Sequence, residues 1–226
     1  MQSNFALFGP VHILILLSIP ALAAALAMCV RLGLPAERVR FGLAVLVLLS
    51  SIGWYGYLAA RGWLKFPDSL PLELCDATLL LTVIALLTLN PLSTDLAYYG
   101  ALAGTTMALL TPDLWEPFPS FSTVQFFVAH GLVIVAVLFL IWTNQARPRP
   151  GSVWRAMLSV NVFAAAVGGF NVIFGTNYMY LRAKPENVSL LEYLGPWPWY
   201  VLSGEAVALL LFVLLWLPFR HERCNI

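Results

Sequence analysis

The chain has 226 residues, of which 61% are hydrophobic and only 10% are charged, whereas a soluble protein carries about 25% charged residues. Its 12 Lys and Arg and 11 Asp and Glu give a net charge of +1, which offers no electrostatic field for nucleic acid. Three cysteines are too few for a disulfide scaffold. The composition therefore predicts an all-α membrane protein, a single polytopic domain covering residues 1–226.

Seven apolar segments approach or exceed the length of a membrane-spanning helix, which is about 20 residues. The fourth segment is the shortest. Pro, Gly, Asn and Asp separate the segments, as in Asn90-Pro91 and Thr111-Pro112-Asp113, and these residue types mark breaks between helices. We expect a bundle of seven transmembrane helices over residues 9–30, 39–60, 70–89, 96–110, 122–143, 153–174 and 197–217.

The distribution of Lys and Arg predicts the orientation, because cytoplasmic loops carry an excess of both. With seven spans, the side of the C-terminus carries eight of these residues and the opposite side four. We therefore expect the N-terminus outside and the C-terminus in the cytoplasm. The protein is predicted to be a multi-pass integral protein of the cell membrane.

Polar side chains within the spans are concentrated in the outer half. Such residues are costly in hydrocarbon, so each is by default a functional candidate. The inner half offers chiefly Cys29 and Asn161. This asymmetry predicts one site near the outer surface, formed by His12, Glu73, Cys75, Asp76, His130, Asn171 and Glu205.

Cys75 is the candidate nucleophile of this site. It lies in the first turns of a predicted helix, where partial positive charge favours a thiolate. The carboxylates of Glu73 and Asp76 oppose the thiolate, so a base is needed, and His130 is the candidate. The remaining polar residues would support the pair by orienting the imidazole. Cys29 and Cys224 have no comparable surroundings.

Each of these residues also has a purely structural interpretation. A lone cysteine is often a small buried apolar side chain, and His12 could be an interfacial residue. Asn171 follows two glycines and could bond across a helix contact. Ser122 and Gln125 have the spacing of a capping box, and Gly100-x-x-x-Gly104 is a helix-packing motif.

Metal and cofactor chemistry fit this sequence poorly. The three histidines show no His-x-x-x-His spacing and the cysteines no Cys-x-x-Cys spacing, so we expect no metal site. Lys65 and Lys184 lie in predicted loops, which excludes a retinal Schiff base. We expect no cofactor.

The outer loop from about Gly175 to Pro196 is unusually hydrophobic. Long loops of this kind are commonly functional. We expect the loop to fold back over the outer face of the bundle.

Four stretches of the sequence resemble the YwaF-like integral membrane family, which includes the eukaryotic transmembrane protein 164. The resemblance covers nearly the whole chain. Its motifs are Leu70–Cys75, Phe126–His130, Asn177–Pro185 and Gly195–Tyr200.

This resemblance implies an acyltransferase that moves fatty acyl chains onto lysophospholipids with a Cys and a His as its catalytic pair. The matching positions are Cys75 and His130, so phospholipids and lysophospholipids are the expected partners, through an acyl-thioester intermediate. The resemblance also implies a distant likeness in fold to androgen-induced membrane hydrolases, which cut fatty-acid esters with Thr and His. The lipid head group is expected to bind Arg182 and Lys184, with Asn177 and Tyr178 of the same motif, although both cations could equally be solvated.

Two other functions stay open at this point. The same pair could hydrolyse a lipid or fatty-acid ester. A non-catalytic carrier of a small ligand or of protons could instead use Glu205 with His130, although the sequence contains no inverted repeat. A structural or assembly protein would leave the buried charges unexplained.

Overall fold

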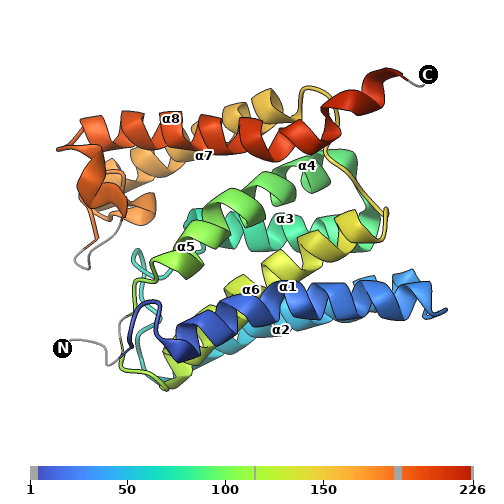
Figure 1. Cartoon of the computed structure of the whole chain (residues 1–226). Helices are drawn as coiled ribbons and strands as arrows, with labels where there is room; N and C mark the ends of the chain where they lie inside the picture. The colour runs from blue at the N-terminus through green and yellow to red at the C-terminus, as the bar shows by residue number, and fades with distance from the viewer. Residues whose placement is uncertain (1–4, 115, 186–189, 225–226) are drawn as a thin grey trace.

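The computed structural model describes residues 5–114, 116–185 and 190–224, and every regular element in these ranges is helical (Figure 1). In chain order the elements are α1 (Pro10–Arg31), α2 (Ala36–Ala60), α3 (Leu74–Thr88), α4 (Pro91–Tyr99), the π-helix η1 (Gly100–Thr105), α5 (Thr106–Leu110), α6 (Phe121–Trp142), α7 (Ser152–Phe174), the 3₁₀-helices η2 (Tyr178–Tyr180) and η3 (Leu190–Leu194), α8 (Trp199–Trp216) and the 3₁₀-helix η4 (Leu217–Cys224).

Five helical stretches are long and apolar enough to cross a membrane. They are α1, α2, α6, α7 and Trp199–Arg220, which combines α8 with the start of η4. The prediction of an all-helical, multi-pass membrane protein is thereby confirmed. The other two predicted spans correspond to α3, with 15 residues, and to the run α4–η1–α5. The number of seven spans and the orientation of the termini stay predictions.

Helix α6 is the central helix of the fold. It packs against α1 and α2 on one side and against α3, η1 and α5 on the other. Figure 1 shows α7 and α8 beyond the α3–α5 layer, away from α1 and α2. Most of the large side chains with almost no exposure come from α3, α4 and α6, including Leu86, Tyr99 and Phe139. The centre of the bundle is thus largely apolar.

The third helix begins at Leu74, four residues later than predicted. Pro71 disfavours helical backbone before it, and Glu73 is extended, with φ −75° and ψ 151°. The backbone N–H of Glu73 donates to Oδ2 of Asp76 at 3.2 Å, which is one half of a capping box. Glu73 is therefore the residue before the helix, and Cys75 lies in the first turn.

The fourth helical run begins at Pro91, five residues earlier than predicted. The side chain of Asn90 accepts hydrogen bonds from the N–H groups of Leu92 at 3.0 Å and Ser93 at 3.1 Å. Asparagine at the N-cap followed by proline is a strong helix start. Asn90-Pro91 thus begins this helix as well as ending the preceding one.

The predicted capping box of Ser122 and Gln125 is wrong. The hydroxyl of Ser120 accepts the hydrogen bond from the N–H of Thr123, at 3.4 Å. Gln125 instead donates from Nε2 to the carbonyl of Ser50 at 3.1 Å. Gln125 therefore ties α6 to α2.

Buried Asp95 joins the start of α4 to the start of α7. Its carboxylate is fully buried and lies 2.8 Å from the guanidinium of Arg149 and 2.9 Å from that of Arg155. The N–H of Arg149 also donates to Asp95 at 3.0 Å. Because a buried charge needs such compensation, Asp95 fixes the end of the bundle at which α4 and α7 begin.

The glycine motif contributes to packing through one of its two members. A Cβ on Gly100 would lie 2.5 Å from Oγ1 of Thr78 on α3, whereas a Cβ on Gly104 would meet nothing closer than Leu74 Cδ2 at 3.8 Å. Gly100 therefore permits a close contact between η1 and α3, which a larger residue would prevent.

We expect Gly100→Ala to lower the free energy of unfolding by about 1–3 kcal/mol, as overpacking of a tight contact does. Gly104→Ala is the matched control and is expected to change stability by less than about 0.5 kcal/mol. Thermal unfolding of both variants in detergent measures the difference. Equal melting temperatures would contradict the role of Gly100.

Candidate functional site

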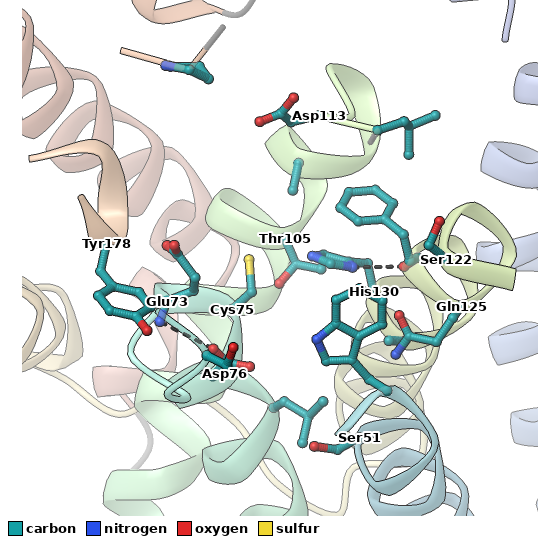
Figure 2. Close-up of a pocket in the computed structure, with 18 of the residues that line it drawn as sticks. Ser51, Glu73, Cys75, Asp76, Thr105, Asp113, Ser122, Gln125, His130 and Tyr178 are labelled. Carbon is teal, nitrogen blue, oxygen red and sulfur yellow. Dashed lines mark hydrogen bonds between the residues drawn. The ribbon is translucent and has the colours of Figure 1, made fainter. Parts of the chain in front are cut away.

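A cavity of about 850 Å³ opens between α2, α3, η1, α5 and α6. Part of its wall is apolar and comes from Leu58, Leu79, Met107, Ala129 and Val133. Polar side chains also line it, among them Glu73 and Asp76 near the start of α3 (Figure 2). Pockets of about 300–1,000 Å³ are typical of small-molecule sites. The mixed wall suits a molecule with both an apolar and a polar part.

Cys75 lines this cavity from the first turn of α3. The partial positive charge of the helix N-terminus favours a thiolate there, but burial and the nearby carboxylates of Asp76 and Glu73 oppose it more strongly. Cys29 is exposed on α1 and does not line the cavity, and the side chain of Cys224 lies outside the described residues. Cys75 is therefore the cysteine that the described structure places at a site.

His130 lines the same cavity from α6. Its Nδ1 lies 2.7 Å from the carbonyl oxygen of Phe126. A carbonyl only accepts hydrogen bonds, so Nδ1 carries the proton, and Nε2 of the neutral ring is left as an acceptor. Nε2 has no hydrogen-bond partner among the described residues, so it is available as a base.

Cys75 and His130 lie on facing helices and reach the cavity from opposite sides (Figure 2). No hydrogen bond joins the two side chains in the described part of the chain. Thr105, the last residue of η1, lines the same cavity. The structure thus brings the predicted pair into one cavity without direct contact.

Four carboxylates line the cavity, namely those of Asp68, Glu73, Asp76 and Asp113, and the described lining contains no Lys or Arg. Oε2 of Glu73 accepts a hydrogen bond from the N–H of Met179 at 2.9 Å. Glu73 and Asp76 line the cavity together with Cys75, as predicted. The polar part of the cavity therefore carries an excess of negative charge.

The segment of residues 175–185, called the cap here, covers the cavity. The hydroxyl of Tyr178 donates to the carbonyl of Pro67 at 2.7 Å and accepts from the N–H of Leu70 at 2.8 Å. The hydroxyl of Tyr180 donates to Asp113 at 2.7 Å. Residues 175–185 of the predicted loop thus fold back over the bundle, and Tyr178 and Tyr180 line the cavity. Residues 186–189 of that loop lie outside the described residues, and the outward facing of the loop stays a prediction.

Tyr180 is held in its neutral form. Burial raises the pKa of its hydroxyl, and the hydrogen bond to the Asp113 carboxylate raises the pKa further. A second tyrosine, Tyr200 of α8, donates to the carbonyl of Tyr180. Tyr180 therefore acts as a hydrogen-bond donor that ties the cap to the segment after α5.

Asn171 and Asn177 shape the cap and do not line the cavity. The side chain of Asn171 donates to the carbonyl of Tyr178 at 2.9 Å and accepts from the N–H of the same residue at 3.0 Å. Asn177 accepts from the N–H of Arg182 at 2.9 Å. Asn171 thus satisfies backbone groups that would otherwise be unpaired in a buried turn, whereas the bonds of Asn177 are exposed to solvent.

The two cations of the cap also lie outside the cavity lining. Arg182 donates to the carbonyls of Asn171 at 3.1 Å and Thr176 at 3.3 Å. Lys184 lies 3.6 Å from Glu192 and 5.8 Å from the ring centroid of Tyr200. Their predicted contact with a lipid head group stays a prediction.

His12 and Glu205 lie outside the cavity lining as well. His12 is fully buried; it accepts from the N–H of Phe8 at 3.0 Å, so its other nitrogen donates to the carbonyl of Leu109 at 2.8 Å. Glu205 accepts from Nδ2 of Asn161 at 2.9 Å and joins α8 to α7. His12 therefore links α1 to α5, and neither residue reaches Cys75.

A polar cluster at the rim holds the segment between α5 and α6. The hydroxyl of Ser122 donates to Glu116 at 2.5 Å, and Arg61 lies 3.3 Å from the same carboxylate. The hydrogen bond from Ser122, with smaller contributions from Tyr57 and Arg61, holds the pKa of Glu116 below its usual range. The ionised Glu116 thus connects the segment between α5 and α6 to Ser122 and to Arg61.

Sequence reasoning missed several polar residues of the cavity, among them Thr105, Asp113 and Tyr180. Asp113 follows a proline in an apparent helix break, and Tyr180 belongs to the loop that was predicted to cover the site. Those two could have been found by asking which loop side chains face the predicted site. Thr105 has no signal in the sequence, since its position depends on the π-helix.

The described residues contain no group of three or more His, Cys, Asp and Glu side chains placed to hold a metal ion.

The sequence model of the TMEM164 family matches residues 7–216, which include all the helices from α1 to α8. The chain belongs to the TMEM164 family. A relative from Treponema pallidum (strain Nichols), an uncharacterized protein, is 28% identical over 225 residues, which cover 97% of this chain and 92% of the relative. No solved structure matches. The match to the TMEM164 family thus includes both Cys75 and His130.

Proposed function

We propose that this protein is a membrane-embedded acyltransferase that moves fatty acyl chains between phospholipids and lysophospholipids. The observation that supports the proposal is the cavity in which Cys75, in the first turn of α3, faces His130, whose Nε2 is unpaired among the described residues. A nucleophile and a base in one cavity are the components of covalent acyl transfer.

In the first half of the reaction, the Cys75 thiolate attacks the ester carbonyl of a phospholipid. The tetrahedral intermediate collapses as the C–O bond breaks, and the departing lysophospholipid oxygen takes the proton that His130 received from the thiol. Cys75 then carries the acyl chain as a thioester. In the second half, the hydroxyl of another lysophospholipid gives its proton to His130 and attacks the thioester, and the proton returns to the sulfur.

The lining of the cavity favours a lipid ester as acyl donor. Its apolar wall matches acyl chains, and its four carboxylates oppose a free fatty-acid anion or an isolated phosphate. A head group that carries an ammonium group fits this lining better, with Arg182 and Lys184 as cations at the outer edge. With the N-terminus outside, the cavity faces the exterior, where acyl-CoA is not available and phospholipid is the remaining source.

A hydrolase is the second candidate, because water could replace the lysophospholipid in the second half-reaction at the same cavity. The carrier hypothesis loses its main support, since Glu205 bonds to Asn161 away from His130. Transferase and hydrolase differ in their products: a transferase places the acyl chain on a labelled lysophospholipid, whereas a hydrolase releases free fatty acid.

The test is mass spectrometry of the purified protein after incubation with a phospholipid of defined acyl chains. We expect a fatty-acyl mass on the peptide that contains Cys75, removable by hydroxylamine as a thioester is. Cys29→Ala should retain the adduct, since Cys29 lies outside the cavity. Absence of an adduct under conditions of turnover would refute the thioester intermediate.

A further inference from the structure

A second hollow lies at the opposite ends of α2 and α3 from the candidate site. It has a volume of about 450 Å³ and is called the basic hollow here. The first turns of α2 and the last turn of α3 form it, through Glu37, Arg38, Arg40, Phe41, Leu86 and Leu87. None of these residues lines the cavity that contains Cys75. The basic hollow is therefore a separate site, and what it binds does not depend on the proposed function.

Arg40 is incompletely paired in the basic hollow. Its Nη1 donates to the carbonyl of Leu86 at 3.1 Å. In the described part of the chain, two buried side-chain polar atoms have no hydrogen-bond partner, Nε of Arg40 and Oγ1 of Thr94. Of these two atoms, Nε of Arg40 belongs to a charged group. A charged group with a buried, unpaired donor is costly, so the position of Arg40 calls for a partner.

Two other arginines of the protein show how this side of a guanidinium group is used. Arg149 and Arg155 each donate from both Nε and Nη2 to the Asp95 carboxylate, at distances of 2.8 to 3.1 Å. Nε and Nη2 form one planar edge, which matches the oxygens of carboxylates and phosphates. In Arg40, neither atom of this edge has a hydrogen-bond partner among the described residues. Arg40 thus retains an unused edge of the kind that binds oxyanions.

The charges of the basic hollow favour an occupant with one negative charge. Its lining contains two arginines, Arg38 and Arg40, and one carboxylate, Glu37, which leaves a net charge of +1. Arg31 ends α1 and adds a further positive charge in the connection that leads to α2. A phosphodiester carries one negative charge, so it balances the lining.

Apolar side chains continue from the basic hollow along the surface of α2. Phe41 lines the hollow and is 63% exposed. Leu48 and Ile52 are exposed as well, and their spacing of seven and four residues places them on the same face of the helix as Phe41. Because α2 is long and apolar enough to cross a membrane, this face suits lipid tails, while arginines at a helix end lie at head-group level. An occupant with an anionic head and apolar tails matches both parts.

We propose that the basic hollow binds the phosphate of an anionic membrane phospholipid. The phosphate accepts a hydrogen bond from Nη2 of Arg40, and a small rotation of the guanidinium group brings the buried Nε into the same contact. Arg38 adds a second positive charge, and the acyl chains lie along Phe41 and the exposed face of α2. Basic pockets between membrane helices bind anionic head groups in other proteins.

The test is native mass spectrometry of the full chain in mixed micelles that contain either phosphatidylglycerol or phosphatidylcholine. We expect one phosphatidylglycerol to bind about tenfold or more tightly than phosphatidylcholine. Arg40→Gln should weaken this binding about tenfold, because charge-assisted hydrogen bonds to the phosphate are lost. Arg38→Gln should weaken it about fivefold, the usual contribution of one cation near anionic lipid.

Two further variants separate lipid binding from an effect on folding. Arg61→Gln is the matched control, because Arg61 follows the other end of α2 and lies far beyond the screening length of about 10 Å; its binding should stay within about twofold of the parent. Glu37→Gln should strengthen binding about fivefold, since it removes the negative charge of the lining. Opposite effects of Arg38→Gln and Glu37→Gln would not arise from a loss of folding.

The remaining outcomes identify other occupants or none. Equal affinity for phosphatidylglycerol and phosphatidylcholine, or parent-like binding by both Arg38→Gln and Arg40→Gln, would overturn the proposal. Phosphatidylethanolamine that bound as tightly as phosphatidylglycerol would indicate a zwitterionic head group and would also overturn it. Inorganic phosphate in large excess should not displace the lipid. If it did, with the same dependence on Arg40, the hollow would bind a soluble phosphate and the lipid proposal would be wrong.

Discussion

Replacement of Cys75 by alanine is expected to reduce acyl transfer by about a thousandfold or more, as loss of a covalent nucleophile does. The reason is that Cys75 is the cysteine of the described structure that lines the cavity, so its loss leaves no atom to hold the acyl chain. The measurement is movement of an isotope-labelled acyl chain from a phospholipid to a lysophospholipid in proteoliposomes.

Cys29→Ala is the control for this experiment. Cys29 is exposed on α1, so its loss should leave transfer within about twofold of the parent. If Cys75→Ala retained ester cleavage while His130→Ala lost it, the enzyme would activate water or a lipid hydroxyl directly, and no thioester would be needed. If Cys75→Ala retained full transfer, the sulfur would have no chemical role.

His130→Ala is expected to lower the rate of acyl transfer by about 10²–10⁴-fold, the usual contribution of a general acid–base. The hydrogen bond from Nδ1 to the Phe126 carbonyl at 2.7 Å fixes the tautomer, so that Nε2 is the atom that takes and returns the proton. The cavity has room for a free imidazole in place of the lost ring, so added imidazole should restore part of the rate. The measurement is the transfer rate of the variant with and without imidazole.

His12→Ala is the matched control, because His12 also bonds to backbone but lies outside the cavity. It should lower the melting temperature while the transfer rate per folded molecule stays near that of the parent. Imidazole should not affect it. An unchanged transfer rate in His130→Ala would contradict the role of His130 as the base. So would a lower rate that is fully explained by a smaller folded fraction, as is expected for His12→Ala.

Much of the helical architecture could be predicted from the sequence, because uninterrupted apolar runs are sufficient to identify helices in hydrocarbon. The predicted spans over residues 9–30, 122–143 and 153–174 agree with α1, α6 and α7 to within one residue at each end. The errors occur where a proline changes the local backbone. Pro71 delays α3 and thereby places Cys75 in a first turn, and Pro91 begins α4 earlier than the apolar pattern does.

The candidate site could be predicted only in part. Cys75 and His130 were predicted to share a site because both are reactive groups near the same ends of their helices, and both line one cavity. His12, Asn171 and Glu205 were predicted to lie in the same outer half of the spans. Their partners, however, are the carbonyl of Leu109, the carbonyl of Tyr178 and the amide of Asn161, respectively. Which of these polar groups meet depends on how each helix is rotated about its axis, and composition does not determine that rotation.

The two ends of this bundle are held by bonds of different strength. Where α4 and α7 begin, the buried Asp95 carboxylate binds two partly exposed guanidinium groups, and leaving such a buried charge uncompensated costs about 3–5 kcal/mol. At the cavity, the cap is attached by separate hydrogen bonds from Tyr178, Tyr180 and Met179, each worth about 0.5–1.5 kcal/mol, or about 1.5–3 with a carboxylate. Any opening wide enough to admit a lipid should therefore begin at the tyrosines, with Asp95 as the fixed pivot.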